Sequence, residues 1–138
     1  IFPALNFYMV FATEKDCPDL LARLGEESWT ASQKHKKKYA YSMVSWVKNR
    51  IVTAETCGDM LLLRVSAVLK SCNKDRIEGI MEKVSLREDG EYQYSCRELM
   101  SFFLVEITAY LPLDFEQQQA EIKFLFERLD NLLKMAGN

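Results

Sequence analysis

Four short segments of the sequence carry the pattern of an α-helix start. Each has Ser, Thr or Asp followed three residues later by Glu or Gln, at residues 30–33, 75–78, 95–98 and 114–117. In this capping box the first side chain accepts a hydrogen bond from a first-turn amide, and the Glu or Gln side chain bonds back to the first residue. Apolar residues at helical spacing follow each box, so an all-α fold is predicted.

The helices are expected in six segments, at residues 18–24, 31–54, 59–71, 76–86, 97–111 and 115–136. Gly25 is expected to end the first and Gly137 the last, because glycine is favoured just beyond helix C-termini. Pro112 is expected to end the fifth, because proline disfavours helix in the residue before it. The segment 59–71 is apolar nearly all round, which places it at the centre of the bundle.

The whole chain, residues 1–138, is expected to form a single compact domain. It is long enough to bury a core without disulfides or metals, and no linker or internal repeat divides it. The predicted architecture is a bundle, or a short HEAT-like stack, of six or seven helices. Residues 1–15 are ambiguous between helix and strand and could form a separate N-terminal segment.

Composition favours a globular domain and argues against several classes of function. Hydrophobic residues make up 49% and charged residues 28% of the chain, as in ordinary globular proteins. The net charge of −2 gives no general attraction to nucleic acids or anionic membranes. No apolar stretch reaches the ~20 residues that span a bilayer, so no membrane partner is predicted. The chain begins with Ile1, which we interpret as the start of a fragment or of a processed product.

The four cysteines, Cys17, Cys57, Cys72 and Cys96, are widely spaced, and the chain has one histidine. The usual zinc-binding spacings are missing, so no metal or cofactor is predicted. Free thiols and an intracellular location, in the cytoplasm or nucleus, are favoured. In a secreted protein, Cys57 and Cys72 would flank one predicted helix and could not pair with each other. The disulfides would then be Cys17–Cys57 with Cys72–Cys96, or Cys17–Cys72 with Cys57–Cys96.

The sequence contains none of the common catalytic motifs. Neither GxxxxGK[ST] nor GxGxxG occurs, and His35 lies among lysines whose charges disfavour its protonation. Glu106 interrupts the very apolar segment 97–111, and we expect it to lie on a narrow polar stripe of that helix. The alternative is a buried carboxylate with a basic partner. We predict no catalytic residue and expect the protein not to be an enzyme.

The leading hypothesis is a non-catalytic interaction module, a scaffold or adaptor part of a larger intracellular protein. It would bind another protein, such as an acidic surface or a helical peptide, through a groove or an exposed helix face. Exposed cations and aromatic residues commonly anchor interfaces. The candidate partner-binding residues of these two kinds are Lys34, Lys37, Lys38, Trp29, Tyr92 and Tyr94.

Two alternative hypotheses come from other classes of function. One is a secreted signalling protein of the four-helix, cytokine-like kind, held by two disulfides. The other is nucleic-acid binding through the Lys34–Lys38 basic patch, which should weaken steeply as salt concentration rises.

Overall fold

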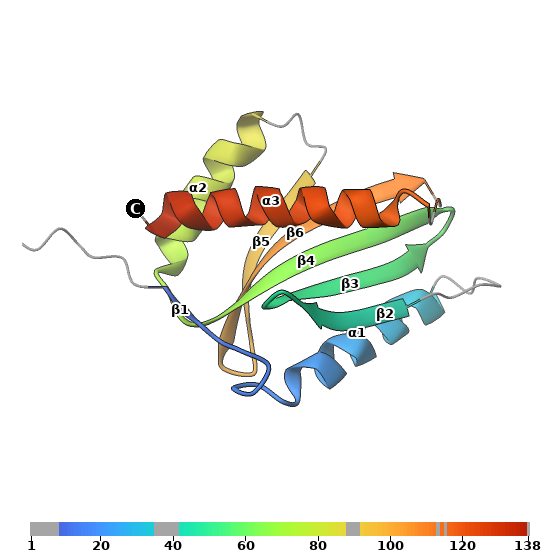
Figure 1. Ribbon diagram of the computed structural model, residues 1–138, viewed down its shortest axis with the longest axis horizontal. Helices are drawn as coiled ribbons and strands as arrows, with labels where there is room; N and C mark the ends of the chain where they lie inside the picture. Colours follow the sequence, from blue (N-terminus) through green and yellow to red (C-terminus); the bar gives the residue numbers. More distant parts are fainter. Residues whose placement is uncertain (1–8, 35–41, 88–91, 113, 115, 138) are drawn as a thin grey trace, which may run out of the picture.

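The computed structural model of the protein describes residues 9–34, 42–87, 92–112, 114 and 116–137, and these residues form an α/β fold (Figure 1). Six antiparallel strands and three helices replace the predicted six- or seven-helix bundle or HEAT-like stack, so the all-α prediction is wrong. The elements in chain order are β1 Val10–Phe11, α1 Leu20–Lys34, β2 Ser42–Val47, β3 Arg50–Cys57, β4 Met60–Ser71, α2 Lys74–Arg87, β5 Tyr92–Leu99, β6 Phe102–Pro112 and α3 Gln118–Gly137.

The strands form one sheet in the order β2-β3-β4-β6-β5, in which all neighbours are antiparallel. The short strand β1 pairs with the end of β4, beyond the part that β3 covers. Helix α2 connects β4 to β5, which forms one edge of the sheet, while β6 lies between these two strands. This crossover carries α2 over one face of the sheet.

Helices cover both faces of the sheet, and each face has its own apolar core. Helices α2 and α3 lie on one face, and Figure 1 shows α3 running across the front of the strands. Helix α1 lies on the other face, against β2 and β3. The α3 side chains that enter the first core are Ile122, Leu125, Leu129, Leu132, Leu133 and Ala136. The result is a three-layer arrangement with the sheet in the middle.

The apolar segment 59–71, predicted as the central helix, is the central strand β4. Its side chains alternate between the two cores: Leu63 and Val65 face α2 and α3, whereas Val68 faces the α1 side. A strand covered on both faces is apolar at nearly every position, as is a fully buried helix. Apolar content alone therefore does not distinguish the two structures, and the helix prediction for this segment is wrong.

The predicted helices 31–54 and 97–111 are also wrong, because two strand hairpins occupy most of these segments. The turn between β2 and β3 is Lys48–Asn49, with φ angles of 49° and 63°. The turn between β5 and β6 is Met100–Ser101, with φ angles of 53° and 69°. Two consecutive positive φ angles match the twist of antiparallel strands. Asn49 tolerates such an angle, but lysine, methionine and serine rarely adopt one, so these two turns carry little of the usual sequence signal.

Two of the predicted helices coincide with observed ones. The segment 76–86 corresponds to α2 and 115–136 to α3. Asn73, rather than the expected Asp75, caps α2: its side-chain oxygen accepts a hydrogen bond of 3.1 Å from the Arg76 amide. The first helix starts near the expected place but continues through Gly25 to Lys34. Within the ambiguous residues 1–15, Val10–Phe11 is a strand.

The segment between β1 and α1 is fastened to the end of β4. The Asp16 carboxylate accepts hydrogen bonds from the Thr13 amide at 2.7 Å and hydroxyl at 3.0 Å, and it pairs with Lys70 at 3.0 Å. The hydrogen bond from the Thr13 amide has the largest effect on the pKa of Asp16, and that from Lys70 the second largest. Together with the Thr13 hydroxyl they lower this pKa to about 2. One residue on, the buried Cys17 thiol donates to the Thr13 carbonyl at 3.2 Å. These contacts fix where α1 begins and place Cys17 in the core on the α1 side.

Candidate functional site

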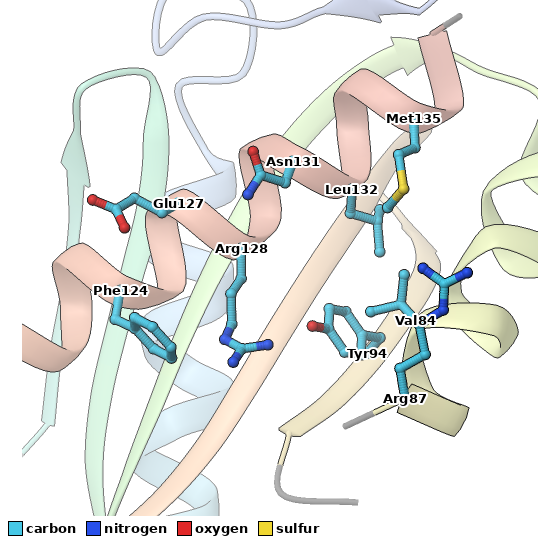
Figure 2. A pocket seen from close by; sticks show the side chains of 9 residues that line it. All are labelled: Val84, Arg87, Tyr94, Phe124, Glu127, Arg128, Asn131, Leu132 and Met135. Carbon is cyan, nitrogen blue, oxygen red and sulfur yellow. The ribbon is translucent and has the colours of Figure 1, made fainter. Parts of the chain in front are cut away.

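A cleft opens where α2 and α3 pass over the edge strand β5 (Figure 2). Its volume is about 360 Å³. Figure 2 shows Val84 and Arg87 of α2 on one side, Phe124 and Arg128 of α3 on the other, and Tyr94 of β5 between them. Nine residues line this α2–α3 cleft: Val84, Arg87, Tyr94, Phe124, Glu127, Arg128, Asn131, Leu132 and Met135.

The cleft combines apolar surface with two guanidinium groups. Phe124 and Met135 are 39% and 43% exposed, which is high for large apolar side chains on an otherwise packed helix. Leu132, in contrast, is buried and belongs to the core beneath. A pocket of this kind can hold an apolar side chain in its body and an anionic group at its rim.

Two aromatic rings hold the Arg128 side chain in place. Its guanidinium carbon lies 4.3 Å from the centre of the Tyr92 ring and 4.4 Å from that of Phe124. The two rings are themselves 5.9 Å apart. A guanidinium stacked on aromatic faces loses little additional freedom when it binds a carboxylate, because it is already ordered. Arg128 is thus the pre-positioned cation of the cleft.

A second depression of about 400 Å³ runs along α2 and shares Val84, Arg87 and Met135 with the cleft. We call it the α2 groove; its other lining residues are Arg76, Gly79, Ile80 and Lys83. Together the cleft and the groove are lined by four basic side chains and one acidic side chain, Glu127. The chain as a whole carries a net charge of −2. Positive charge is therefore concentrated on this surface.

The α2 groove is open at Gly79, which lies in the middle of a helix. A Cβ atom added there meets no atom within 4 Å. Because alanine favours helix more than glycine does, we expect Gly79→Ala to raise the free energy of unfolding by about 0.5–1 kcal/mol in urea denaturation. Gly137→Ala is the control, since its Cβ would lie 3.0 Å from Met9 Cε and should bring no such gain. A loss of stability in Gly79→Ala would contradict the open groove.

A third cavity, of about 520 Å³, lies between α3 and the turn of the β2–β3 hairpin. Its charged lining residues are two lysines, Lys48 and Lys123, and two acids, Glu127 and Asp130. Asp130 is already paired with Arg50 at 3.0 Å. This cavity is larger than the α2–α3 cleft, but its balanced charges favour no particular partner, and we do not assign it a function.

The six residues predicted as partner contacts fall in different places. Tyr94 lines the α2–α3 cleft, and Tyr92 is buried beneath Arg128 rather than exposed. Trp29 and Lys34 belong to α1, but the structure describes only their backbone and not their side chains. Lys37 and Lys38 lie outside the described residues, as does most of the Lys34–Lys38 basic patch.

The sequence analysis did not select Arg87, Arg128 or Phe124. A signal for the groove was available, because Arg76, Lys83 and Arg87 follow one another at intervals of seven and four residues. That spacing puts all three on one face of a helix. The contribution of α3 depends on how α3 crosses α2, which helical periodicity does not reveal.

On the opposite face of the sheet, Glu106 is a buried carboxylate with basic partners. Its side chain is 2% exposed and accepts hydrogen bonds from Arg97 Nε at 2.7 Å and from the Ser66 hydroxyl at 3.0 Å. Arg64 Nε lies 3.8 Å away. The expected polar helix stripe is therefore wrong, because Glu106 lies on β6, and the alternative of a buried, paired carboxylate describes the site.

The Glu106 cluster connects the sheet to α1. Arg97 also pairs with Glu27 of α1 at 3.0 Å, so one guanidinium joins a buried and a half-exposed carboxylate. Burial opposes the charge of Arg97, but hydrogen bonds to Glu27 and Glu106 outweigh it and raise the pKa of Arg97 above its ordinary value. Since both oxygens of Glu106 are engaged, we assign the cluster a structural role.

Three comparisons, with models of known protein families, with curated proteins and with solved structures, find no match to this chain. Within the described residues, no group of three or more His, Cys, Asp or Glu side chains could hold a metal ion. No helix in that part of the chain is both long and apolar enough to cross a membrane.

Proposed function

We propose that the protein is a non-catalytic interaction module that binds an acidic segment of another protein in the α2–α3 cleft. The observation that carries the proposal is the concentration of four basic side chains around exposed apolar surface in an acidic chain. The bound segment would place an apolar side chain against Phe124 and Met135 and its carboxylates near Arg87 and Arg128. We keep an intracellular location as part of the proposal.

Complementary charge is the reason for an acidic partner. Arg87 is exposed at the end of α2, and Arg128 is held across the cleft by its stacking on Tyr92 and Phe124. Guanidinium groups bind carboxylates in a two-pronged geometry that a lysine does not provide. Aromatic and arginine side chains are also the residues that most often dominate binding energy at interfaces.

The same chemistry makes nucleic acid a weaker candidate for this cleft. Binding of single strands depends on free aromatic faces on which bases stack. Here the faces of Tyr92 and Phe124 are taken by the Arg128 guanidinium. Nucleic-acid binding through the Lys34–Lys38 basic patch stays a separate prediction. The cytokine-like alternative loses its four-helix framework, because the described residues form three helices and a sheet.

The test uses the full chain and three dye-labelled probes in fluorescence anisotropy. The first is a peptide of about ten residues in which Glu and Asp alternate with Phe and Leu, as groove-binding peptides alternate anchors and polar residues. The second peptide has Lys in place of each acid, and the third probe is an oligothymidine. We expect binding of the acidic peptide alone, with an affinity that falls as salt concentration rises. Preference for the oligothymidine, or equal binding of both peptides, would contradict the proposal.

Charge reversal then locates the site. Arg87→Glu is expected to weaken binding of the acidic peptide roughly tenfold or more, because it replaces an attraction by a repulsion at the cleft. Arg23→Glu is the matched control: it changes the net charge equally, and Arg23 is an exposed residue of α1, on the other side of the sheet. Equal losses in the two variants would indicate nonspecific attraction and would overturn the assignment of the cleft.

A further inference from the structure

Two of the cysteines come together on the α2 side of the sheet although they are far apart in the sequence. Cys72 lies in the short connection between β4 and α2, and Cys96 lies on the edge strand β5. Both are half-buried and pack against the same apolar core. The chain leaving β4 passes over β6 so that α2 can pack on β5, which carries Cys96, and Cys72 lies two residues before α2.

The Cys96 thiol acts as a hydrogen-bond donor toward the Cys72 sulfur, which partly offsets the rise in the pKa of Cys72 that burial causes. Both are free thiols, and charged side chains of α2 and β5 surround them: Lys74, Glu78 and Glu98. Cys17 has a different setting, since it is buried in the core on the opposite face and bonded to the Thr13 carbonyl. Among the three cysteines whose side chains the structure describes, the fold therefore singles out Cys72 and Cys96 as a pair.

We propose that Cys72 and Cys96 are an oxidation site, at which a small-molecule disulfide such as oxidised glutathione converts the two thiols into an intramolecular disulfide. The proposal does not depend on what the α2–α3 cleft binds. Of the pairings that the sequence allowed, Cys72–Cys96 agrees with this geometry, whereas its companion Cys17–Cys57 does not, because Cys17 lies by the Lys70 end of β4 and Cys57 pairs with Met60 at the other end. The other set would join Cys72 to Cys17, which lies on the opposite face of the sheet.

The reaction takes place in two exchanges. The Cys72 thiolate attacks one sulfur of the glutathione disulfide; a Cys72–glutathione bond forms, the original bond breaks, and one glutathione leaves and is protonated. Cys96 then gives up its proton to solvent and attacks the Cys72 sulfur, releasing the second glutathione. Two protein thiols are oxidised to one disulfide, and one glutathione disulfide is reduced to two thiols.

Burial and hydrogen bonding set the order of these steps. Burial raises the pKa of both thiols, that of Cys96 to about 12, but the hydrogen bond from Cys96 favours the Cys72 thiolate. Cys72 is thus the attacking sulfur, because exchange requires a thiolate. Once the mixed disulfide has formed, Cys96 is already adjacent, so the second exchange is intramolecular.

The disulfide would enclose α2 in a covalent loop. The closed segment 72–96 contains the whole helix and the first half of β5. Cross-linking such a loop restricts the unfolded chain and should raise the melting temperature by roughly 10 °C. The bond would join the N-terminal end of α2 to the strand on which the helix packs.

The test is peptide mapping of the full chain after incubation in a glutathione buffer, with free thiols blocked and no reductant added. Trypsin releases each cysteine in a different peptide: Cys17 in 16–23, Cys57 in 51–64, Cys72 in 71–74 and Cys96 in 88–97. We expect a linked pair of peptides 71–74 and 88–97, and the higher melting temperature should vanish when reductant is added. Persistent glutathione adducts, links to peptides 16–23 or 51–64, or four free thiols in the most oxidising buffer would each overturn the proposal.

Substitution tests the order of the two exchanges. Cys96→Ser is expected to stop at a stable Cys72–glutathione adduct, whereas Cys72→Ser should give little adduct at Cys96 under the same conditions. If the two variants accumulated adducts equally, Cys72 would not be the attacking thiol. The wild-type mapping does not require either variant to fold, so the pairing itself is tested independently of them.

Discussion

Replacing Glu106 by glutamine is expected to lower the free energy of unfolding by about 2–3 kcal/mol. The carboxylate is buried between Arg97 and Arg64 and accepts a hydrogen bond from the Ser66 hydroxyl. Glutamine keeps the shape but removes the charge, which leaves the half-exposed Glu27 as the remaining ionic partner of Arg97 among the described residues. Breaking a fully buried pair costs about 3–5 kcal/mol, and we expect less here because Arg97 is 35% exposed.

Urea denaturation of the wild type and the variant measures this effect. Glu98→Gln is the matched control, because Glu98 is an exposed acid next to Arg97 on β5 and should change stability by less than about 0.5 kcal/mol. A double-mutant cycle with Arg97→Leu should give a coupling energy above about 1 kcal/mol. If Glu106→Gln cost no more than Glu98→Gln, the buried ion cluster would not hold α1 on the sheet.

The environment of Glu106 depends on whether its segment is a helix or a strand, so the sequence alone leaves two alternatives for this residue. On a helix, Ser101, Glu106 and Thr108 could share a narrow polar stripe. On β6, Glu106 and Thr108 are two residues apart and face the same side of the sheet, beside Ser66 and Arg64 on β4. Ser66 and Arg64 come from a strand about forty residues earlier, and Arg97 comes from the neighbouring strand β5, so the pairing of strands rather than a local pattern places these partners beside Glu106.

The strands themselves were missed for a physical reason. In β2 and β3, residues Met43, Val44, Val47 and Ile51 fall at intervals that suit a helix face, but the turn Lys48–Asn49 separates them. The segment is rich in β-branched residues, which favour strands, and this preference outweighs the helical spacing. Capping boxes were also misleading, since 95–98 lies in β5 and 30–33 lies at the end of α1.

The parts that sequence analysis located were the two amphipathic helices that form the walls of the cleft. Helices α2 and α3 each have one apolar face, and their periodicity was read correctly. Tyr94 was chosen as a candidate contact from composition and lines the cleft. How α2 and α3 meet over β5 is set by the crossover from β4, and this relation follows from the sheet order rather than from either helix.

Leu129→Ala is expected to have the largest effect of any substitution considered, a loss of about 3–4 kcal/mol in the free energy of unfolding. Leu129 lies on α3, is 0% exposed and faces the sheet, next to Arg128, which faces the cleft. Truncating a fully buried leucine removes apolar contacts and leaves a cavity that the surrounding core only partly fills. Lys134→Ala, at an exposed position of the same helix, is the control and should change stability by less than about 0.5 kcal/mol.

The comparison between these two α3 variants bears directly on the cleft. If α3 is held by Leu129 and its neighbours on the sheet side, its outer residues are free to contact a partner without supporting the fold. A loss below about 1 kcal/mol for Leu129→Ala in urea denaturation would show that α3 does not pack on the sheet through this face. The cleft, which depends on α3 lying over β5 and beside α2, would then lose the wall that carries Phe124 and Arg128.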